Sequence, residues 1–583
     1  VNGNDLHALA AGSGLIDLRL VQPESKFTLS TGDITARAAN KPITLQADDF
    51  EFLSGAEQLI GTGAIAIETI SNPIAFRLGT VAEDKLGEKI DLPQSVDLSS
   101  EDLAAFADGF SLVTLGQSND AEGGNEMIFG DAYDAQFLKY ATSTLNETPR
   151  LRDYSFRDEW IFTTDKLYFR GEVNAPVDRL EFRAGEVFVE SKNLHNPAGL
   201  PDSGVVAKDL VFVVDEKMAV DGWIVGADKL DLDVIATKGV HSLTQGINGR
   251  IGSLNDNSVL LLDAKKGIDL WGLTEVKGTD SRVQFNAGTS FYLQEGGKII
   301  GRETGADLKA TSAGSLNIGS GSAMTAGARF DDSSGSPVAV KTADNGDVIL
   351  ESAHELRILG VITTSDGMAL SSGSDREGTL GFRMAGTLTS LADNATLVLG
   401  SVEDVHLEGD VEVLGVNSDL VVEAAGDIKV IAGTLDVRDD IRIHAGKGSE
   451  TGDLILYDQA YVNARGAEAA IELMAFADVI VGAPVVAGGV ATSTGISWQS
   501  VGTASILVDA GERVKVDAPM LAGLKVEVRS GSPGSDDADL SLEVTTVGGL
   551  TAKGYGAASP ALVKLAGDGN VRISGNLLSG GYL

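Results

Sequence analysis

A two-strand unit recurs along this chain and constrains its fold more than any other feature. In each unit two apolar residues alternate with polar ones, a small residue follows, and two more apolar residues stand eight positions after the first two. The clearest example is Leu260 and Leu262, followed by Ala264 and then by Ile268 and Leu270. Alternation with a period of two is typical of β-strands with one buried face, and a small residue between two strands suits a tight corner.

The unit repeats at intervals that match one coil of a parallel β-solenoid. Its first apolar residue recurs after 23 residues, from Leu260 to Val283, and after 25 residues, from Val283 to Leu308. Repeats of about 20 to 50 residues are typical of solenoids, in which each coil stacks on its neighbours. The sequence therefore predicts an all-β fold, a parallel β-helix in which inward positions form apolar ladders. Further units begin at Val348, Leu420, Ile471, Ile506 and Val563.

Changes in this pattern divide the chain into three predicted parts. Residues 1–95 are interpreted as irregular solenoid coils, and residues 204–583 as a regular parallel β-helix. Residues 96–203 are interpreted as an insert with a short helix, because Ser99 is a plausible N-cap, helix-forming residues continue to Ala107, and Gly109 follows.

Two local enrichments accompany this division. Basic and aromatic residues gather between 150 and 200, where we expect them to cover the seam at which the insert rejoins the solenoid; a contact patch for carbohydrate or protein is the alternative. The segments 321–346 and 530–539 are rich in Gly, Ser and Asp and are predicted to be loop excursions at coil corners.

Composition excludes several classes of function. The chain has 45 basic and 84 acidic residues, a net charge of −39, so nucleic acid is not an expected partner. It has no cysteine, which excludes disulfides, thiolate metal sites and a cysteine nucleophile. Its six histidines are scattered without the spacing of zinc ligands. We find no apolar stretch of about 18 residues, so no transmembrane helix is expected.

Acidic loops are the remaining candidates for chemistry. Adjacent carboxylates at 48/49, 331/332, 439/440 and 536/537 could serve catalysis, but Asp also terminates strands and bonds its own turn, and we expect no enzymatic role. Flexible loops rich in carboxylate oxygens suit Ca²⁺, the one ion we expect, although no cofactor is firmly indicated. The predicted calcium ligands are Asp331, Asp332, Asp344, Asp347, Asp536 and Asp537.

The coils also carry a family resemblance. Segments such as DLVVEAAGDIKVIAGTLDV and ADLKATSAGSLNIGSGSAM resemble the β-helical repeats of filamentous haemagglutinin-like bacterial exoproteins. The segment IGTGAIAIETI, followed by DLSSEDLAAFADGFSLVTLG, is similar to a module of very large repetitive surface proteins of Gram-negative bacteria. The resemblance implies an extracellular adhesin, stalk or filament component at the bacterial cell surface.

These observations define two expected functions. The first is a structural or adhesive segment of a large extracellular surface protein or filament, whose partners are other copies, further solenoid, or a glycan or cell surface. The alternative is a polysaccharide-processing β-helix enzyme or tailspike-like depolymerase. Because the first residues lack a signal-peptide pattern, and because the coil pattern runs through Val571 and Ile573 close to the last residue, we expect a piece of a longer chain or filament.

Overall fold

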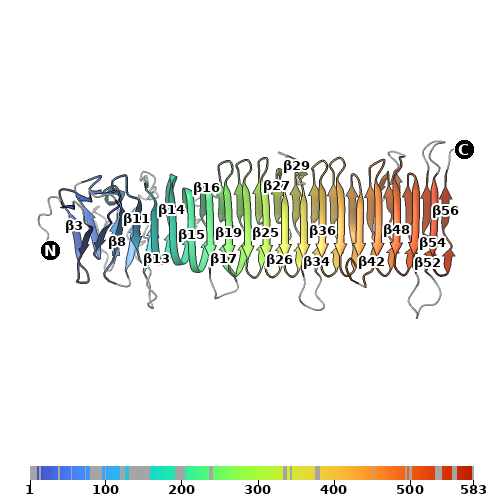
Figure 1. Ribbon diagram of the computed structural model, residues 1–583, viewed down its shortest axis with the longest axis horizontal. Helices are drawn as coiled ribbons and strands as arrows, with labels where there is room; N and C mark the ends of the chain where they lie inside the picture. Colours follow the sequence, from blue (N-terminus) through green and yellow to red (C-terminus); the bar gives the residue numbers. More distant parts are fainter. Residues whose placement is uncertain are drawn as a thin grey trace, which may run out of the picture. The chain divides into compact units, whose positions relative to one another are not determined.

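The chain forms a parallel β-helix, as a computed structural model shows. It divides into two compact units, Val1–Gly278 (unit 1) and Thr279–Leu583 (unit 2). Figure 1 shows the strands of each unit running side by side. The predicted all-β fold is confirmed. The structure describes residues 9–11, 15–36, 40–53, 55–71, 74–78, 95–98, 100–117, 125–129, 156, 158–190, 204–235, 241–331, 338–341, 345–373, 381–449, 451–492, 495–497, 502–531, 541–553 and 561–580.

Each coil of unit 2 contributes one strand to each of three parallel sheets. The first sheet consists of β22 (Arg282–Ala287), β25 (Asp307–Ser312), β30 (Val348–Ser352), β33 (Met368–Ser372), β36 (Thr396–Ser401), β39 (Asp419–Ala424), β41 (Ile441–Ala445), β43 (Ala470–Ala475), β48 (Ser505–Ala510), β51 (Lys525–Ser530) and β54 (Leu562–Gly567). The second consists of β23 (Phe291–Leu293), β26 (Leu316–Ile318), β31 (Leu356–Ile358), β34 (Phe382–Met384), β37 (Val405–Leu407), the start of β40 (Ile428–Val437), the start of β42 (Leu454–Ala464), β44 (Val479–Val481), β49 (Val514–Val516), β52 (Leu542–Val544) and β55 (Val571–Ile573). The third consists of β24 (Lys298–Gly301), β27 (Ala323–Ala326), β32 (Val361–Thr364), β35 (Thr387–Ser390), β38 (Asp410–Val413), the ends of β40 and β42, β45 (Val485–Ala487), β50 (Pro519–Ala522), β53 (Gly549–Ala552) and β56 (Asn576–Ser579).

Unit 1 also consists of stacked parallel strands, four of which are long, with 10 to 18 residues. Its first parallel sheet contains β2 (Ile16–Arg19), β5 (Ile43–Gln46), β8 (Ala64–Glu68), β11 (Leu112–Gly116), β13 (Trp160–Phe169), β14 (Glu172–Val189), β15 (Gly204–Val220), β16 (Trp223–Val234) and β19 (Val259–Ala264). The other faces are formed by β13–β16 and by β1 (Leu9–Ala11), β3 (Lys26–Leu29), β4 (Ile34–Ala36), β6 (Asp49–Phe52), β7 (Leu59–Ile60), β9 (Ala75–Leu78), β10 (Ser95–Leu98), β12 (Glu126–Phe129), β17 (His241–Gln245), β18 (Arg250–Ser253), β20 (Gly267–Leu270) and β21 (Leu273–Val276).

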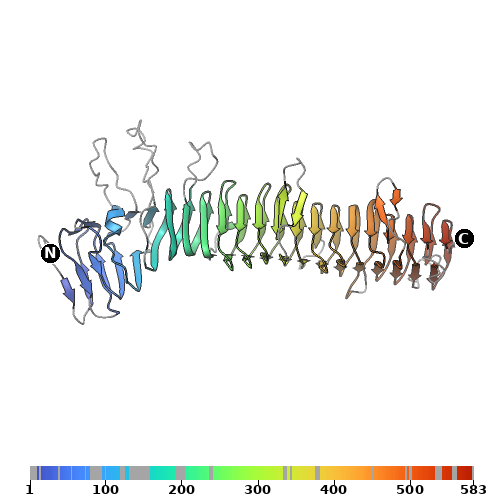
Figure 2. The ribbon, with the colours of Figure 1, turned by 90° about the horizontal axis from the view of Figure 1, so that it is seen from above.

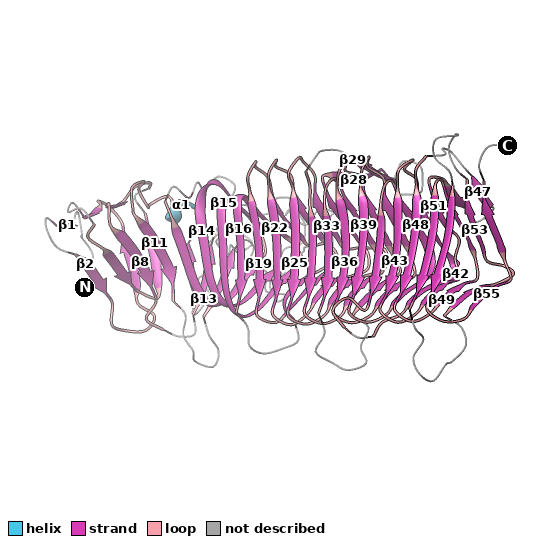
Figure 3. Ribbon diagram, turned by 45° about the vertical axis from the view of Figure 1, so that its right-hand side comes forward, coloured by secondary structure: helices cyan, strands magenta, loops and turns pink. Residues whose placement is uncertain are grey.

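The interval 96–203, interpreted from sequence as an insert, supplies coils to this stack. β11 pairs in parallel with β8 and β13, and β13 pairs with β14. The helix in it is a single turn, α1 (Ser100–Leu103), the cyan element in Figure 3. It ends before Ala107 because the Ala107 amide donates to Leu59 O in the stack instead of continuing the helical pattern. Among the described residues, no helix has the length and apolar character needed to cross a membrane.

The core consists of the in-register apolar ladders that the sequence predicts. Phe285 pairs with Ala310 and Leu293 with Ile318, and all four are buried. The small corner residues are buried as well. The Ser312 hydroxyl lies within hydrogen-bond distance of Ser315 O in its own corner (3.1 Å) and of Thr289 O in the corner of the preceding coil (2.8 Å). These small corner residues are Ala264, Ala287, Ser312, Ser352, Ala424, Ala475 and Ala510.

A second signature precedes the first strand of many coils. Three residues before the first inward side chain stands a residue with a positive φ, such as Asn417 (φ 54°) before Leu420 or Asn394 (φ 59°) before Leu397. Asn and Gly tolerate this left-handed conformation best, and the Nδ2 of Asn417 also donates to Oδ1 of Asn394 in the preceding coil (3.1 Å). The same position is occupied by Asn257, Asp280, Gly305 and Asn345.

Glycine forms a column at another corner, immediately before the third strand of successive coils. A Cβ atom on Gly386 would lie 1.9 Å from Gly360 O, and one on Gly409 would lie 1.9 Å from Gly386 O. Backbones of neighbouring coils therefore approach so closely here that no side chain fits between them.

The predicted excursion 321–346 is wrong in extent, because Ala323–Ala326 forms β27 in the third sheet. What leaves the solenoid is an antiparallel hairpin, β28 (Ala328–Asp331) with β29 (Val338–Lys341). A similar hairpin, β46 (Val490–Thr492) with β47 (Gly495–Ser497), follows β45. Both hairpins follow a third-sheet strand, and Figure 2 shows them, in yellow and orange, projecting on the same side of unit 2. The second predicted excursion, 530–539, lies mostly outside the described residues.

Candidate functional site

Aspartates form a column along one edge of the second sheet of unit 2. The Asp404 carboxylate accepts a hydrogen bond from the Asp427 amide (2.8 Å), Asp427 accepts from Asp453 (2.9 Å), and Asp453 accepts from Asp478 (3.0 Å). Asp478 accepts from the Arg513 amide (3.1 Å). Each carboxylate thus ties its coil to the next, so this column of acidic residues is part of the scaffold.

The members of this column differ in their electrostatic surroundings. Burial raises the pKa of Asp427, but the hydrogen bonds from the Asp453 amide and from Lys429 Nζ (2.9 Å) outweigh burial, and the net pKa is lowered. Burial also raises the pKa of Asp453, and the nearby charges of Asp427 and Asp478 keep it raised. Ionisation is therefore favourable for folding at Asp427 and unfavourable at Asp453.

Two neutral substitutions in the column should have opposite effects at pH 7. Asp427→Asn removes the charge that pairs with Lys429, and we expect the free energy of unfolding to fall by about 1 kcal/mol. Asp453→Asn keeps an oxygen that accepts from the Asp478 amide and removes a repelled charge, so stability should stay equal or rise. Denaturant unfolding of both variants measures this difference.

The pH dependence has a matching sign. The stabilisation from Asp427 is present above its unfolded pKa and is lost as the pH falls through its lower folded pKa. The folded pKa of Asp453 is raised, so its contribution is present at low pH and is lost as the pH rises through that folded value. If Asp427→Asn and Asp453→Asn lower the free energy of unfolding equally at pH 7, the opposite pKa shifts of the two aspartates would be contradicted.

Three other aspartates of unit 2 form the one group among the described residues in which three carboxylates could share a cation. Oxygens of Asp419, Asp439 and Asp440 lie within 4.8 Å of one another. Asp419 accepts from the Asp440 amide (3.1 Å) and Asp440 from the Ala470 amide (2.8 Å). Burial raises the pKa of Asp439, and the charges of Asp440 and Asp419 add to it. A hard cation with oxygen ligands, such as Ca²⁺, would relieve this repulsion.

Calcium is therefore expected to stabilise unit 2. An ion that binds the folded state at a concentration ten times its dissociation constant adds about 1.4 kcal/mol to the free energy of unfolding. Melting temperatures measured in EDTA and in millimolar Ca²⁺ test this, with Asp439→Asn as the variant that should lose the response. An identical calcium response in Asp439→Asn would place the ion elsewhere.

The calcium ligands expected from sequence are a different set. Of these, Asp347 is fully described, and its carboxylate accepts from the Gly367 amide (2.8 Å), which makes it another tie between coils. Burial raises its pKa, and the charge of Asp307 adds to this. For Asp331 the structure describes the backbone, in β28. Asp332, Asp344, Asp536 and Asp537 lie outside the described residues, so their role as ligands stays a prediction.

Four adjacent carboxylate pairs are considered for catalysis. In the pair 48/49, Asp48 has a structural role, because its carboxylate binds backbone amides. Its carboxylate accepts from the amides of Glu24 (2.8 Å), Ile70 (2.7 Å) and Ser71 (2.7 Å). Burial raises the pKa of Asp48, but these bonds and the Ser71 hydroxyl lower it overall. The sequence predicts that Asp bonds its own turn, but Asp48 instead ties the neighbouring coils together.

The aromatic residues of the expected seam lie mainly in the core of unit 1. Phe156, Trp160 and Phe169 are buried, whereas Tyr168 faces outward and stacks on Phe188 (5.2 Å between ring centroids). At these three positions the side chains therefore neither cover a seam nor form an exposed contact patch. Arg150, Arg152, Tyr154 and Arg157 lie outside the described residues.

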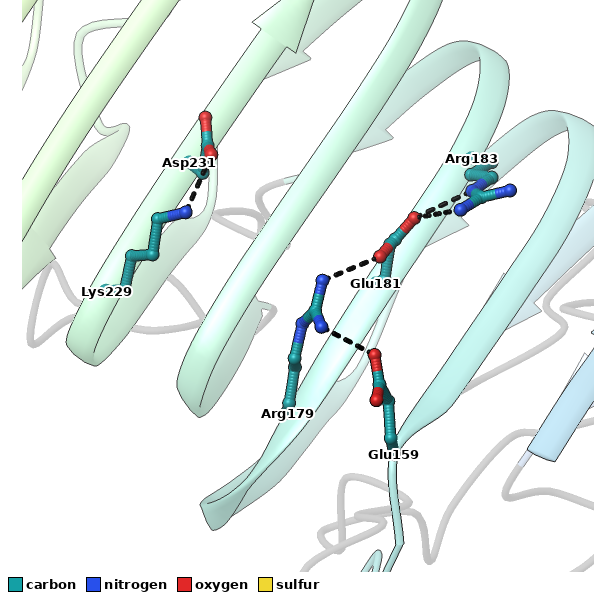
Figure 4. A network of polar contacts seen from close by, with 6 residues as sticks. All are labelled: Glu159, Arg179, Glu181, Arg183, Lys229 and Asp231. Atoms are coloured by element: carbon teal, nitrogen blue, oxygen red, sulfur yellow. Dashed lines mark hydrogen bonds and ion pairs between the residues drawn. The ribbon is translucent and has the colours of Figure 1, made fainter. Parts of the chain in front are cut away.

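The outer face of β14 carries an ion network. The nearly buried carboxylate of Glu181 forms ion pairs with Arg183 Nη2 (2.6 Å) and Arg179 Nη2 (3.0 Å). Arg179 Nη1 reaches Glu159 (2.6 Å), and Lys229 pairs with Asp231 (3.0 Å) nearby (Figure 4). These charges neutralise one another within the stack.

The surface features that sequence reasoning missed are those formed by residues from different coils. Asp419 stands 20 positions before Asp439, and only the coil length brings them together. A period of 20 to 30 residues applied to outward positions would have indicated such groups.

Searches against protein-family models, curated proteins and solved structures find no match to this chain.

Proposed function

We propose that this chain is a structural, adhesive segment of a large extracellular bacterial surface protein or filament. The observation that carries the proposal is that polar side chains of unit 2 hold one coil to the next. The Asp404–Asp478 column is one example, and the ladder of Asn394 and Asn417 is another. Such a stack suits a long scaffold that presents its loops. The resemblance of the coils to haemagglutinin-like exoproteins supports the extracellular location.

Glu527 is paired both within its own strand and with the next coil. Its carboxylate contacts Lys525, Lys564 Nζ (2.7 Å) and Arg529 Nε (2.8 Å), and these hydrogen bonds lower its pKa to about 2. The three cationic side chains cover it almost completely from solvent. Outward charges in this part of unit 2 are thus satisfied within the protein, which supports a scaffold role for them.

The proposed partners are further solenoid or a second copy, together with a glycan or cell surface. The resemblance of the coils to haemagglutinin-like exoproteins, which implies a stalk or filament component, supports the first kind of partner. Calcium is the ion we propose for the acidic corners. We propose no enzymatic activity for the scaffold itself.

Surface labelling and adhesion test the proposal together. Antibodies against the folded chain should label intact source cells without permeabilisation, and beads coated with the chain should adhere to other cells more than beads coated with the heat-unfolded chain. Labelling that requires permeabilisation would refute the extracellular role. Equal adhesion of both kinds of bead would refute the adhesive role and leave the structural one.

One pair of carboxylates favours the second candidate, polysaccharide processing. Glu412 and Asp436 face outward from adjacent strands, and Asp436 binds Arg465 Nε (2.6 Å) and Asn463 Nδ2 (2.8 Å). Burial, together with the charges of Asp436 and Asp410, raises the pKa of Glu412. A carboxyl with a raised pKa beside an ion-paired carboxylate is an arrangement used in acid–base catalysis. Release of reducing ends from bacterial polysaccharides that is lost in Glu412→Gln would establish this activity.

A further inference from the structure

A shallow hollow of about 480 Å³ lies on unit 2, where the outer face of the first sheet meets a corner. Three of its lining side chains belong to one outward row, because His444 pairs with Met474 and Met474 with Asp509 on consecutive strands β41, β43 and β48. The rest are Ala475, the last residue of β43, and residues of the two corners that follow β43 and β48. The lining residues are His444, Met474, Ala475, Phe476, Asp509, Gly511 and Glu512.

Phe476 gives the hollow an apolar wall that the fold leaves open. The residue is 45% exposed, although a large aromatic side chain usually gains by burial. Its backbone is held on both sides, since a Cβ on Gly511 would lie 1.9 Å from Phe476 O and one on Gly446 would lie 2.7 Å from Phe476 Cβ. The neighbouring corners therefore fix Phe476 in place without covering its ring.

A second part of the lining is acidic, formed by Asp509 and Glu512. Asp509 lies 3.6 Å from Arg529 Nη1, whereas no ion pair involves Glu512 within the described part of unit 2. Elsewhere on this face acidic side chains are paired, as at Glu527. In a chain with a net charge of −39, an acidic wall attracts a cation and repels an anion.

We propose that this hollow binds a lysine or arginine side chain of a partner protein. The aliphatic stem would lie on Met474 and Phe476, with the cationic head between the ring of Phe476 and the carboxylates of Asp509 and Glu512. A cation over an aromatic face beside a carboxylate combines two favourable interactions, and arginine is enriched at such contacts. The inference deepens the proposed adhesive role by naming the chemistry of one contact, and it rests on that role for the existence of a protein partner.

Methionine methyl groups offer a direct readout. The chain has seven methionines, so a ¹³C-methyl-methionine NMR spectrum of the whole protein is simple, and Met474→Leu identifies the signal of Met474. We expect acetyl-arginine methylamide to shift the Met474 signal, and the neutral citrulline analogue to shift it at least about fivefold less. The signals of the buried Met324 and Met520 should not move.

Matched variants separate this site from general attraction of cations. Glu512→Gln and Phe476→Ala should each weaken arginine binding at least about fivefold, whereas Glu303→Gln, at an exposed corner of the same unit, should not. An unmoved Met474 signal, an equal response to citrulline, or an equal effect of Glu303→Gln would overturn the proposal. Failure here with normal adhesion of coated beads would refute this contact and leave the proposed function standing.

Discussion

Replacing Gly409 by alanine is expected to lower the free energy of unfolding of unit 2 by about 3 kcal/mol. The new Cβ would lie 1.9 Å from Gly386 O in the preceding coil. A Cβ added to Gly386 would lie equally close to Gly360 O. The backbone at Gly386 therefore cannot move away from a new side chain at Gly409 without displacing the coil that contains Gly360. Denaturant unfolding measures the total loss, and hydrogen exchange in β35 and β38 locates it.

Gly400→Ala is the control for this substitution. Gly400 lies within β36, and the nearest atom to its added Cβ is Leu370 O, at 4.0 Å. We expect stability to stay equal or to rise by up to about 1 kcal/mol, because alanine restricts the unfolded chain. Equal losses at both positions would show that the close approach between coils is not what requires glycine at Gly409.

Phe182→Ala should destabilise unit 1 by about 4 kcal/mol. Phe182 is fully buried and stacks between Phe162 and Phe212, with ring centroids 5.0 Å away on each side. These three residues are in register on β13, β14 and β15, so the backbone ladder prevents the neighbours from closing the cavity. Denaturant unfolding, followed by exchange of the amides of these strands, measures the effect.

Phe188→Ala on the same strand is the matched comparison. Phe188 faces outward, is half-buried and stacks on Tyr168. Its loss should cost less than about 1.5 kcal/mol, since its removal leaves no enclosed cavity. A similar cost for both phenylalanines would mean that strand preference, and not core packing, stabilises this part of the stack.

The repeat could be predicted from sequence because the rules that produce it are local. An inward residue such as Leu293 is recognised by its alternation with polar neighbours, and the corner at Ala287 by its size. Phe162 and Phe182 show the same alternation within the interval 150–200, where basic neighbours suggested a surface seam, and Phe212 continues it in the interval predicted as regular β-helix. The ladder of these three rings shows that the period of two should have outweighed the local composition.

Other features depended on distances between coils that no local pattern contains. The positive-φ residue, as at Asn394, was available to sequence reasoning, because it stands three positions before the first inward residue. Gly409 could not be distinguished among 71 glycines without knowing that Gly386 lies directly below it. Phe476 and Glu512 meet in the hollow only because two corners of different coils stack.

The two antiparallel hairpins have a consequence for how such a chain varies in length. Although β28 and β29 separate Leu308 from Val348 by 40 positions, these two residues are paired directly in neighbouring coils. The hairpin therefore leaves and re-enters the stack without shifting its register. Sequence at this corner can be lengthened, exchanged or deleted while the coils on either side keep their partners. The corner after the third strand is thus a natural acceptor for grafted peptides, and the place where related chains would diversify what they display without changing what holds them together.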